Sequence, residues 1–229
     1  MVNKGFFILG TDTGVGKTLV ATSLLSGLKA KGYSTIGLKP IASGAKPTLE
    51  GLRNDDALWL QKTASISLPY EQVNPFCFAE PIAPHIAAAQ INCRLTVSEM
   101  MEACQFSLNH PADYHIIEGA GGICVPLNKN ELLVDLALAM SFPIILVVGL
   151  RLGCLNQALL NWNYLQQRNL PVAGWLANQV DPDMACVEEN VKFLEVTLPI
   201  PCLGFFPYQQ INLSDLSSLI DYNRLVGTS

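Results

Sequence analysis

The chain has 229 residues, with 14 lysines and arginines against 19 aspartates and glutamates, and a formal net charge of −5. Half of the residues are apolar and 14% are charged, which is typical of a globular protein and excludes extensive disorder. An acidic chain without runs of Lys or Arg lacks the positive surface that binds nucleic acids, so no DNA or RNA partner is expected. We expect a single domain over residues 1–229, since no linker-like change in composition divides the sequence.

An apolar stretch over residues 132–150 is long enough to resemble a membrane span. Asp135 and Pro143 interrupt it, and an uncompensated carboxylate in hydrocarbon costs about 2.5–3.5 kcal/mol. The stretch therefore predicts a short helix followed by a buried strand. The N-terminal apolar run ends at Gly10 and is too short for a signal peptide, so we expect a cytoplasmic protein without a membrane partner.

Six short apolar runs alternate with helical patterns along the chain. These runs span residues 6–10, 35–39, 115–118, 144–149, 172–178 and 202–206. Unbroken hydrophobicity, clearest at residues 144–148, is typical of strands buried on both faces. After the first run, a helical stripe is formed by Val20, Ala21, Leu24, Leu25 and Leu28. The fold class predicted is α/β, a doubly wound and mostly parallel sheet with helices on both faces.

Two segments, residues 41–55 and 66–95, do not fit this alternation, and the second carries four prolines. Connections longer than about 12–15 residues in a compact domain are usually functional loops or disordered. We therefore expect both segments to be loops that contact a substrate.

The strongest chemical signal is the sequence GTDTGVGKT at residues 10–18, between the first predicted strand and the first predicted helix. Backbone N–H groups of such a loop converge on phosphate oxygens, helped by the positive end of the helix. Lys17 would supply charge to the β- and γ-phosphates, and the Thr18 hydroxyl can reach Mg²⁺. The strict motif has Gly where this chain has Thr11, so the loop is one residue longer when counted from Gly10. An ordinary glycine-rich turn is the alternative; we predict a P-loop NTPase-like site for ATP or GTP.

Polar residues also follow each of the predicted strands, where open α/β sheets bind their ligands. They are Asp12, Lys39, Glu118, Arg151, Asn178 and Tyr208. Each one alone is explained equally well as a solvated loop residue, but together they predict a site along one rim. Glu118 opens the sequence EGAGG, and a carboxylate at this strand end is where a P-loop enzyme holds Mg²⁺.

Three of the charged residues have structural alternatives. Asp55 and Asp56 begin a helical pattern, so either can cap the helix; we favour capping for Asp55 and a metal role for Asp56. Lys39 closes a strand, and its structural alternative is a side chain that extends into solvent.

Seven segments match the motifs of one enzyme family in chain order. They are GTDTGVGKT (10–18), KPIASG (39–44), GLRNDDA (51–57), VNPFCFAEPIAPHIAA (73–88), EGAGG (118–122), PIILVVGLRLGCLNQ (143–157) and GWLANQ (174–179). Together they resemble the dethiobiotin synthetases of biotin biosynthesis, over about residues 5–207.

The resemblance implies an ATP- and Mg²⁺-dependent cyclo-ligase. In that family an amine of 7,8-diaminopelargonic acid takes up CO₂ as a carbamate, and the carbamate is phosphorylated at the expense of ATP. The neighbouring amine then displaces phosphate from this carbamoyl-phosphate-type intermediate and closes the ureido ring of dethiobiotin. ADP and phosphate are the other products.

Carried over position by position, the resemblance also implies roles for individual residues. Lys17 and Lys39 would be catalytic, and Thr18, Asp56 and Glu118 would hold Mg²⁺. The nucleotide would contact Thr13, Gly14, Val15, Gly16, Lys17, Thr18, Leu19, Asp56, Glu118, Gly119, Ala120, Gly121, Asn178, Gln179, Pro207, Tyr208 and Gln209. The substrate would contact Thr13 and Ser43, and also Leu152 and Asn156 across the interface of a homodimer with composite active sites.

Other classes of P-loop protein are the alternatives. Regulatory ATPases of the partition and septum-site type carry a second lysine five residues before the P-loop lysine, where this chain has Asp12. A glutamine-dependent ligase of the cobyrinate type needs a further glutaminase domain, for which we expect no room in 229 residues. A nucleotide-binding module without catalysis is the third alternative.

Overall fold

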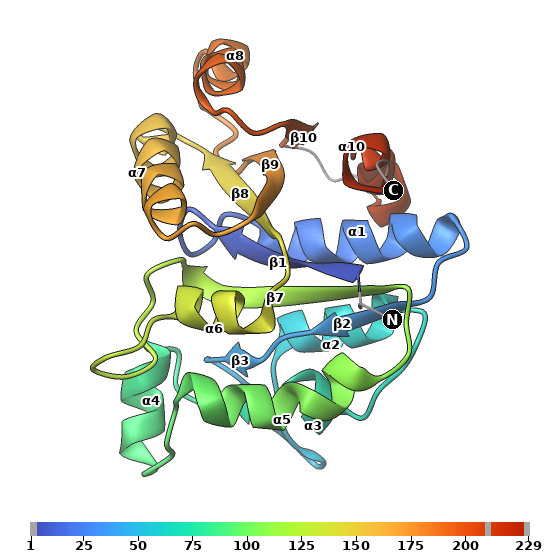
Figure 1. The fold of residues 1–229 in the computed structure, drawn as a ribbon, viewed down its shortest axis with the longest axis vertical. Coiled ribbons are helices and arrows are strands. Elements are labelled where there is room, and N and C mark those ends of the chain that lie inside the picture. Colours follow the sequence, from blue (N-terminus) through green and yellow to red (C-terminus); the bar gives the residue numbers. More distant parts are fainter. Residues whose placement is uncertain (1–3, 209–211, 227–229) are drawn as a thin grey trace.

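A six-stranded sheet forms the centre of the computed structural model, which describes residues 4–208 and 212–226 (Figure 1). The strands of this sheet are β1 (Lys4–Gly10), β2 (Thr35–Leu38), β7 (Tyr114–Gly122), β8 (Ile144–Leu150), β9 (Val172–Gln179) and β10 (Cys202–Phe206). They lie in the order β10-β9-β8-β1-β7-β2, and every pairing is parallel. The six predicted strands and their parallel arrangement are confirmed.

Helices cover both faces of the sheet, with α6 and α7 on one side and α1 and α10 on the other (Figure 1). The helices of the described chain are α1 (Lys17–Ala30), α2 (Asp55–Thr63), α3 (Tyr70–Val73), α4 (Pro84–Gln90), α5 (Val97–Asn109), α6 (Leu133–Met140), α7 (Cys154–Gln167), α8 (Val187–Thr197), α9 (Leu213–Ser218) and α10 (Tyr222–Val226). The predicted doubly wound α/β fold is therefore confirmed.

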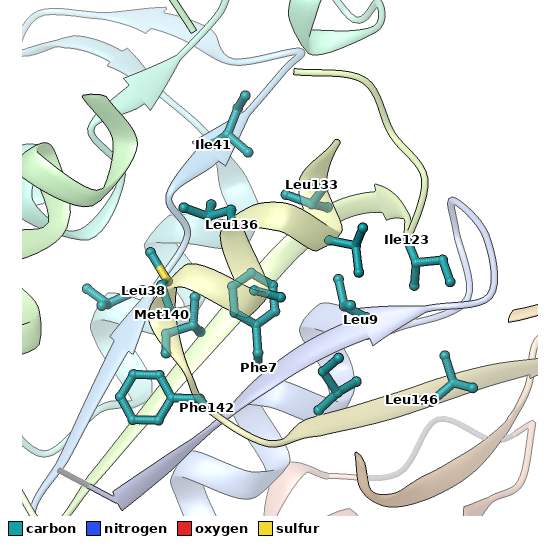
Figure 2. Packing of buried hydrophobic residues seen from close by; sticks show 14 of the residues in the cluster. Phe7, Leu9, Leu38, Ile41, Ile123, Leu133, Leu136, Met140, Phe142 and Leu146 are labelled. Carbon is teal, nitrogen blue, oxygen red and sulfur yellow. The ribbon is translucent and has the colours of Figure 1, made fainter. Parts of the chain in front are cut away.

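Alternate residues of each central strand belong to two hydrophobic clusters on opposite faces of the sheet. Phe7 and Leu9 of β1 pack toward α6 together with Leu146 of β8 (Figure 2). Phe6 and Ile8 belong to the other cluster, which includes the buried leucines of α1. Because both faces are covered, a strand has to be apolar at consecutive positions, and all of β8 is buried.

Helix α1 follows the predicted apolar stripe. The five residues of that stripe, Val20, Ala21, Leu24, Leu25 and Leu28, are all buried. The helix ends at Ala30, and Gly32 (φ +88°) takes the left-handed conformation in which the chain turns toward β2. The face of α1 away from the sheet receives α10: a Cβ at Gly27 would lie 1.9 Å from the Tyr222 hydroxyl, which donates to the Ser23 carbonyl over 3.3 Å.

The long apolar stretch is divided between α6 and β8, as predicted. Its Asp135 lies in the first turn of α6, where it accepts a hydrogen bond from the Leu132 N–H (2.7 Å) and forms an ion pair with Arg168. Within residues 4–208 and 212–226, no helix combines the length and the apolar character needed to cross a membrane.

The two segments that were expected to be loops contain regular structure, so the predicted irregular conformation is wrong, whereas their contact with a substrate stays a prediction. Residues 41–55 include β3 (Ile41–Ala42), β4 (Lys46–Thr48) and β5 (Gly51–Arg53), and residues 66–95 include α3, β6 (Phe76–Cys77) and α4. The pairing of β3 with β6 is parallel and joins the two segments. Strands of two or three residues are too short to show a hydrophobic period, so the sequence pattern did not indicate them.

His115 on β7 is expected to make the stability of the fold pH-dependent. Its side chain is fully buried, with Nε2 3.1 Å from the Ser107 carbonyl oxygen and the ring stacked on Phe142. Burial lowers the pKa of His115 below its ordinary value of 6.5. Below about pH 6.5 the unfolded chain therefore binds a proton that the folded chain does not, and the free energy of unfolding falls.

We expect the melting temperature to fall more steeply between about pH 7 and about pH 5, a range that contains the ordinary His pKa, in the parent than in His115→Gln. Thermal unfolding followed by circular dichroism at a series of pH values measures this difference. Equal slopes for the two proteins would show that His115 does not contribute.

Candidate active site

The P-loop connects β1 to α1 and rests on the core through Val15. Gly14 (φ +73°) and Gly16 (φ +90°) supply left-handed conformations that glycine adopts without strain. The Val15 side chain is fully buried, and a Cβ at Gly149 of β8 would lie 2.7 Å from it. Glycine at position 149 thus lets the loop lie close to the carboxyl ends of the strands.

Lys17 begins α1 and is buried at the base of the loop. Its Nζ donates to the carbonyl oxygen of Asp12 over 3.1 Å. Burial, followed by the charge of Lys39, lowers the pKa of Lys17 from 10.5 to about 8. An ammonium has three N–H donors, so this contact leaves Lys17 able to bind an anionic group such as a phosphate.

Lys39, Glu118 and Asp56 form an ion-pair cluster beside the P-loop. Lys39 Nζ lies 2.5 Å from Glu118 Oε1 and 2.9 Å from Asp56 Oδ2, and the Lys39 and Glu118 side chains are only 4% and 1% exposed. Burial by itself lowers the pKa of Lys39, but the two carboxylates outweigh it and the pKa is raised. At Asp56 the effect of burial is likewise outweighed by Lys39, and the pKa is lowered. Lys39 therefore does not extend into solvent, and that alternative is wrong.

The oxygen atoms around this cluster fit a divalent cation. Thr18 Oγ1 donates to Glu118 Oε1 over 2.8 Å, so the hydroxyl of the P-loop and two carboxylates lie together. Glu118 Oε2 is buried and has no hydrogen-bond partner among the described residues. Burial raises the pKa of Glu118, so a further cation would stabilise its charged form. Carboxylate and hydroxyl oxygens are the ligands that Mg²⁺ prefers.

Asn54 is the N-cap of α2, and the capping role predicted for Asp55 is therefore wrong. The Asn54 side chain accepts a hydrogen bond from the Ala57 N–H over 3.3 Å. Asp55 instead pairs at the surface with Lys46 over 2.6 Å. Asn and Asp cap helices about equally well, so the sequence Asn-Asp-Asp did not distinguish a cap one residue earlier.

A cleft of about 720 Å³ lies above the P-loop and the ion-pair cluster. Among the predicted site residues it is lined by Thr13, Gly14, Gly16, Lys17, Thr18, Lys39, Ser43, Asp56, Glu118, Ala120 and Gly121. The structure thus brings the P-loop, both lysines and the three predicted metal ligands to one cavity. The Ser43 hydroxyl is buried and has no hydrogen-bond partner within the described chain, so it can donate to a bound molecule.

The cleft also has lining residues to which no role was assigned from the sequence. They are Ala42, Asn54, Pro81, Ile82, Ala83, Pro84 and Val125. Residues 81–84 precede and begin α4, in the proline-rich segment. The length and proline content of that segment were the signal, and they indicated the region without indicating these side chains.

Seven of the predicted nucleotide-binding residues that the structure describes are absent from the cleft lining: Val15, Leu19, Gly119, Asn178, Gln179, Pro207 and Tyr208. Val15 is buried, Leu19 lies on α1, and the carbonyl oxygen of Gly119 accepts a hydrogen bond from Lys39 Nζ over 3.3 Å. Asn178 is 5% exposed and donates to the Val15 carbonyl oxygen over 2.9 Å. Its amide thus holds the P-loop against the end of β9.

Two of the predicted nucleotide-binding residues, Gln179 at the end of β9 and Tyr208 after β10, are joined by a hydrogen bond. The Tyr208 N–H donates to Gln179 Oε1 over 3.3 Å, and Pro207 directly precedes Tyr208. Tyr208 is 53% exposed, which leaves its ring accessible to a flat ligand. Gln209 lies outside the described residues.

Leu152 and Asn156 do not line the cleft. Both are exposed at the start of α7, and Leu152 is 97% exposed. The preceding Arg151 pairs with Asp12 over 2.5 Å, and Gln157 donates to the same carboxylate over 3.2 Å. Asp12 therefore joins the beginning of α7 to the P-loop.

Comparisons with known proteins show which family the chain resembles. A family model described as an AAA domain matches residues 4–212. ATP-dependent dethiobiotin synthetase BioD of Cellvibrio japonicus is 48% identical over 218 residues, which is 95% of this chain and 95% of that protein. The protein of the same name from Aeromonas salmonicida is 44% identical over 224 residues, 97% of this chain and 99% of that protein.

Solved structures share the fold at low identity. The MinC:MinD cell division complex of Aquifex aeolicus matches with a TM-score of 0.61 and 15% identity, covering 99% of this chain and 96% of that one. Cobyrinic acid a,c-diamide synthase of Mycobacterium smegmatis, solved with ADP and magnesium, matches with a TM-score of 0.52 and 15% identity, covering 94% and 90%. At this identity the two matches show the P-loop fold alone, whereas the sequence relatives show the family. The chain belongs to the ATP-dependent dethiobiotin synthetases, a family of ATP-dependent ligases.

Proposed function

We propose that the protein forms dethiobiotin, ADP and phosphate from 7,8-diaminopelargonic acid, CO₂ and ATP in a Mg²⁺-dependent reaction. The observation that carries the proposal is the ion-pair cluster of Lys39, Glu118 and Asp56 beside the P-loop lysine, Lys17. A cleft of this kind has the positive charge to bring two anions together and the carboxylates to hold a metal.

The proposed roles follow from what each side chain can bind. Backbone N–H groups of residues 13–19 would bind the phosphates, with Lys17 as a point charge. Thr18, Asp56 and Glu118 would hold Mg²⁺, which supplies charge neutralisation at the β- and γ-phosphates when it is bound. The exposed Tyr208, with Asn178, Gln179 and the neighbouring Pro207 and Gln209, would contact the base.

The proposed reaction has three steps. One substrate amine attacks CO₂ and loses a proton, which gives a carbamate. A carbamate oxygen attacks the γ-phosphorus, and the bond to the ADP oxygen breaks. The second amine attacks the carbamate carbon, phosphate leaves, and the ureido ring closes with loss of the amine proton.

Lys39 would act at the middle step, because the carbamate and the γ-phosphate are both anions that repel each other. Its ammonium lies beside the cleft with a raised pKa and stays charged at neutral pH. The Ser43 hydroxyl would donate to the substrate from the same wall. Positioning and charge stabilisation account for the rate in such transfers, because the protein forms no covalent bond.

Isotope transfer tests the proposed reaction directly. The purified protein is incubated with the diamine, Mg²⁺-ATP and ¹³C-bicarbonate, and the product is analysed by mass spectrometry. We expect dethiobiotin with the label in its ureido carbonyl. Formation of unlabelled product, or of none, would reject the proposal.

The metal assignment predicts that Asp56→Asn and Glu118→Gln each raise the Mg²⁺ concentration that gives the half-maximal rate. Each substitution removes a charged oxygen ligand and keeps the shape of the side chain. Asp55→Asn is the matched control, because Asp55 is the adjacent acid on α2 and pairs with Lys46 at the surface. An unchanged Mg²⁺ curve in Asp56→Asn would remove that residue from the metal site.

We further propose a cytoplasmic homodimer in which Leu152 and Asn156 reach the substrate bound by the partner subunit. Their exposure at the start of α7, away from the cleft of their own chain, supports this proposal. Mixing inactive Lys17→Ala chains with inactive Asn156→Ala chains should restore part of the activity in heterodimers. Heterodimers verified by mass spectrometry that stay inactive would reject the composite site.

A further inference from the structure

A buried chain of hydrogen bonds joins the backbone of Lys39 to the beginning of α2. The Asn54 N–H donates to the Tyr70 hydroxyl over 2.7 Å, and that hydroxyl donates to Asn74 Oδ1 over 2.9 Å. Asn74 Nδ2 then donates to the Lys39 carbonyl oxygen over 2.6 Å. Asn54, Tyr70 and Asn74 are all buried. We call Tyr70 and Asn74, with these three hydrogen bonds, the Tyr70–Asn74 bridge.

Chemistry fixes the direction of each hydrogen bond in the bridge. A backbone N–H only donates and a backbone carbonyl only accepts, so the phenol has to accept from Asn54 and donate to the Asn74 side-chain oxygen. Burial raises the pKa of Tyr70, so the phenol keeps the proton that it donates. The Asn74 amide then presents its NH₂ group to Lys39, since rotating the amide would place its oxygen against a carbonyl oxygen.

Each end of the bridge binds the backbone at or near a residue of the proposed site. At one end, the carbonyl oxygen of Lys39 accepts from Asn74, and the N–H of Lys39 donates to the Val73 carbonyl oxygen over 2.8 Å. At the other end, Asn54 caps the helix whose second residue is Asp56. Tyr70 and Asn74 themselves are absent from the cleft lining, so they can act on a reaction in the cleft only through these neighbours.

We propose that Tyr70 and Asn74 are positioning residues, which set the placement of Lys39 relative to Asp56. The inference deepens the proposed function and rests on it, since it assigns the bridge to the step in which Lys39 acts. A shift of reacting groups by about 1 Å can cost on the order of a hundredfold in rate, so a bridge outside the cleft can control turnover.

Tyr70→Phe tests the bridge with a minimal change. It removes one hydroxyl and keeps the ring, over which the Arg53 guanidinium lies at 4.2 Å from the ring centroid. Tyr222→Phe is the matched control: Tyr222 is also buried, its hydroxyl also donates a hydrogen bond, here to the Ser23 carbonyl oxygen, and it packs on α1 away from the cleft. Tyr70→Phe removes two buried hydrogen bonds and Tyr222→Phe removes one, so melting temperatures are measured to compare the losses of stability.

We expect kcat for dethiobiotin formation to fall at least about tenfold in Tyr70→Phe, with the KM for ATP within about twofold of the parent. In the presence of ATP, the dissociation constant for Mn²⁺, measured by electron paramagnetic resonance, should rise several-fold because Asp56 is displaced. Tyr222→Phe should leave both values unchanged. Asn74→Asp keeps the acceptor for Tyr70 but removes the donor to Lys39, and it should lower kcat to a similar extent.

The inference is overturned if Tyr70→Phe has the same kcat and the same Mn²⁺ affinity as Tyr222→Phe at a temperature where both are folded. The bridge would then contribute to stability alone. The Mn²⁺ titration needs no diamine, so it still tests the placement of Asp56 if the parent protein fails to make dethiobiotin. Failure of the proposed function and failure of the bridge are therefore distinguishable.

Discussion

Replacing Lys39 by Gln is expected to slow dethiobiotin formation at least about a hundredfold, which corresponds to roughly 2.7 kcal/mol, while ATP binds within a few-fold of the parent affinity. The ammonium faces Glu118 and Asp56 at the edge of the cleft, and in the proposed reaction its interaction with the transferring phosphoryl group would grow as charge develops. The loss therefore falls on kcat. Steady-state kinetics at saturating substrates and ATP titration calorimetry measure the two effects.

Lys39→Gln is also expected to lower the stability of the protein, and the kinetic measurements have to take this into account. Lys39→Gln leaves Glu118 buried without its ion-pair partner, and breaking a buried pair in this way costs about 3–5 kcal/mol. Kinetics are therefore measured below the melting temperature of the variant. Lys39→Arg should recover only part of the rate, because a planar guanidinium does not replace a compact ammonium in a buried site. Normal turnover by folded Lys39→Gln would exclude a catalytic role.

Lys17→Ala is expected to abolish turnover and to weaken ATP binding about ten- to a hundredfold, while the fold persists. A hydrogen bond to a charged group contributes roughly 1.5–3 kcal/mol, and Lys17 is the buried lysine of the P-loop. Equilibrium binding of a fluorescent ATP analogue gives the affinity. Near-normal turnover in the variant would contradict the phosphate-binding assignment.

The pH dependence of ATP binding gives an independent check on Lys17. Because its pKa is lowered to about 8, the ammonium of the nucleotide-free protein loses its proton as the pH rises through that value. ATP affinity should therefore decrease above about pH 8 in the parent. Lys17→Ala should lack this decrease, and an identical pH profile in the two proteins would show that another group is responsible.

The sheet could be predicted from the sequence because its strands are buried on both faces. Such strands appear as unbroken apolar runs, as in Ile144–Leu150, and each of the six runs is a strand of the central sheet. The P-loop could be predicted equally well, since glycines and a lysine at fixed spacing mark a loop that precedes a helix. Both patterns lie within short stretches of sequence, so they can be recognised without knowledge of tertiary contacts.

The rest of the site depends on contacts between distant parts of the chain. Asp56 and Asp55 are adjacent acids, and only the fold turns one toward Lys39 and the other toward Lys46 at the surface. The contact between Asn74 and the Lys39 carbonyl joins residues 35 positions apart. No local pattern encodes such a pairing, so the sequence alone indicated the segment around Asn74 and not its hydrogen bonds.

The coupling of ATP cleavage to the diamine tests the central claim most directly. ADP release and dethiobiotin formation are measured in the same reaction, with and without 7,8-diaminopelargonic acid and bicarbonate. A dethiobiotin synthetase should release ADP in step with dethiobiotin, and only when both substrates are present. ADP release that is indifferent to the diamine, with no dethiobiotin formed, would contradict the account and point to an ATPase that uses the same fold for another purpose.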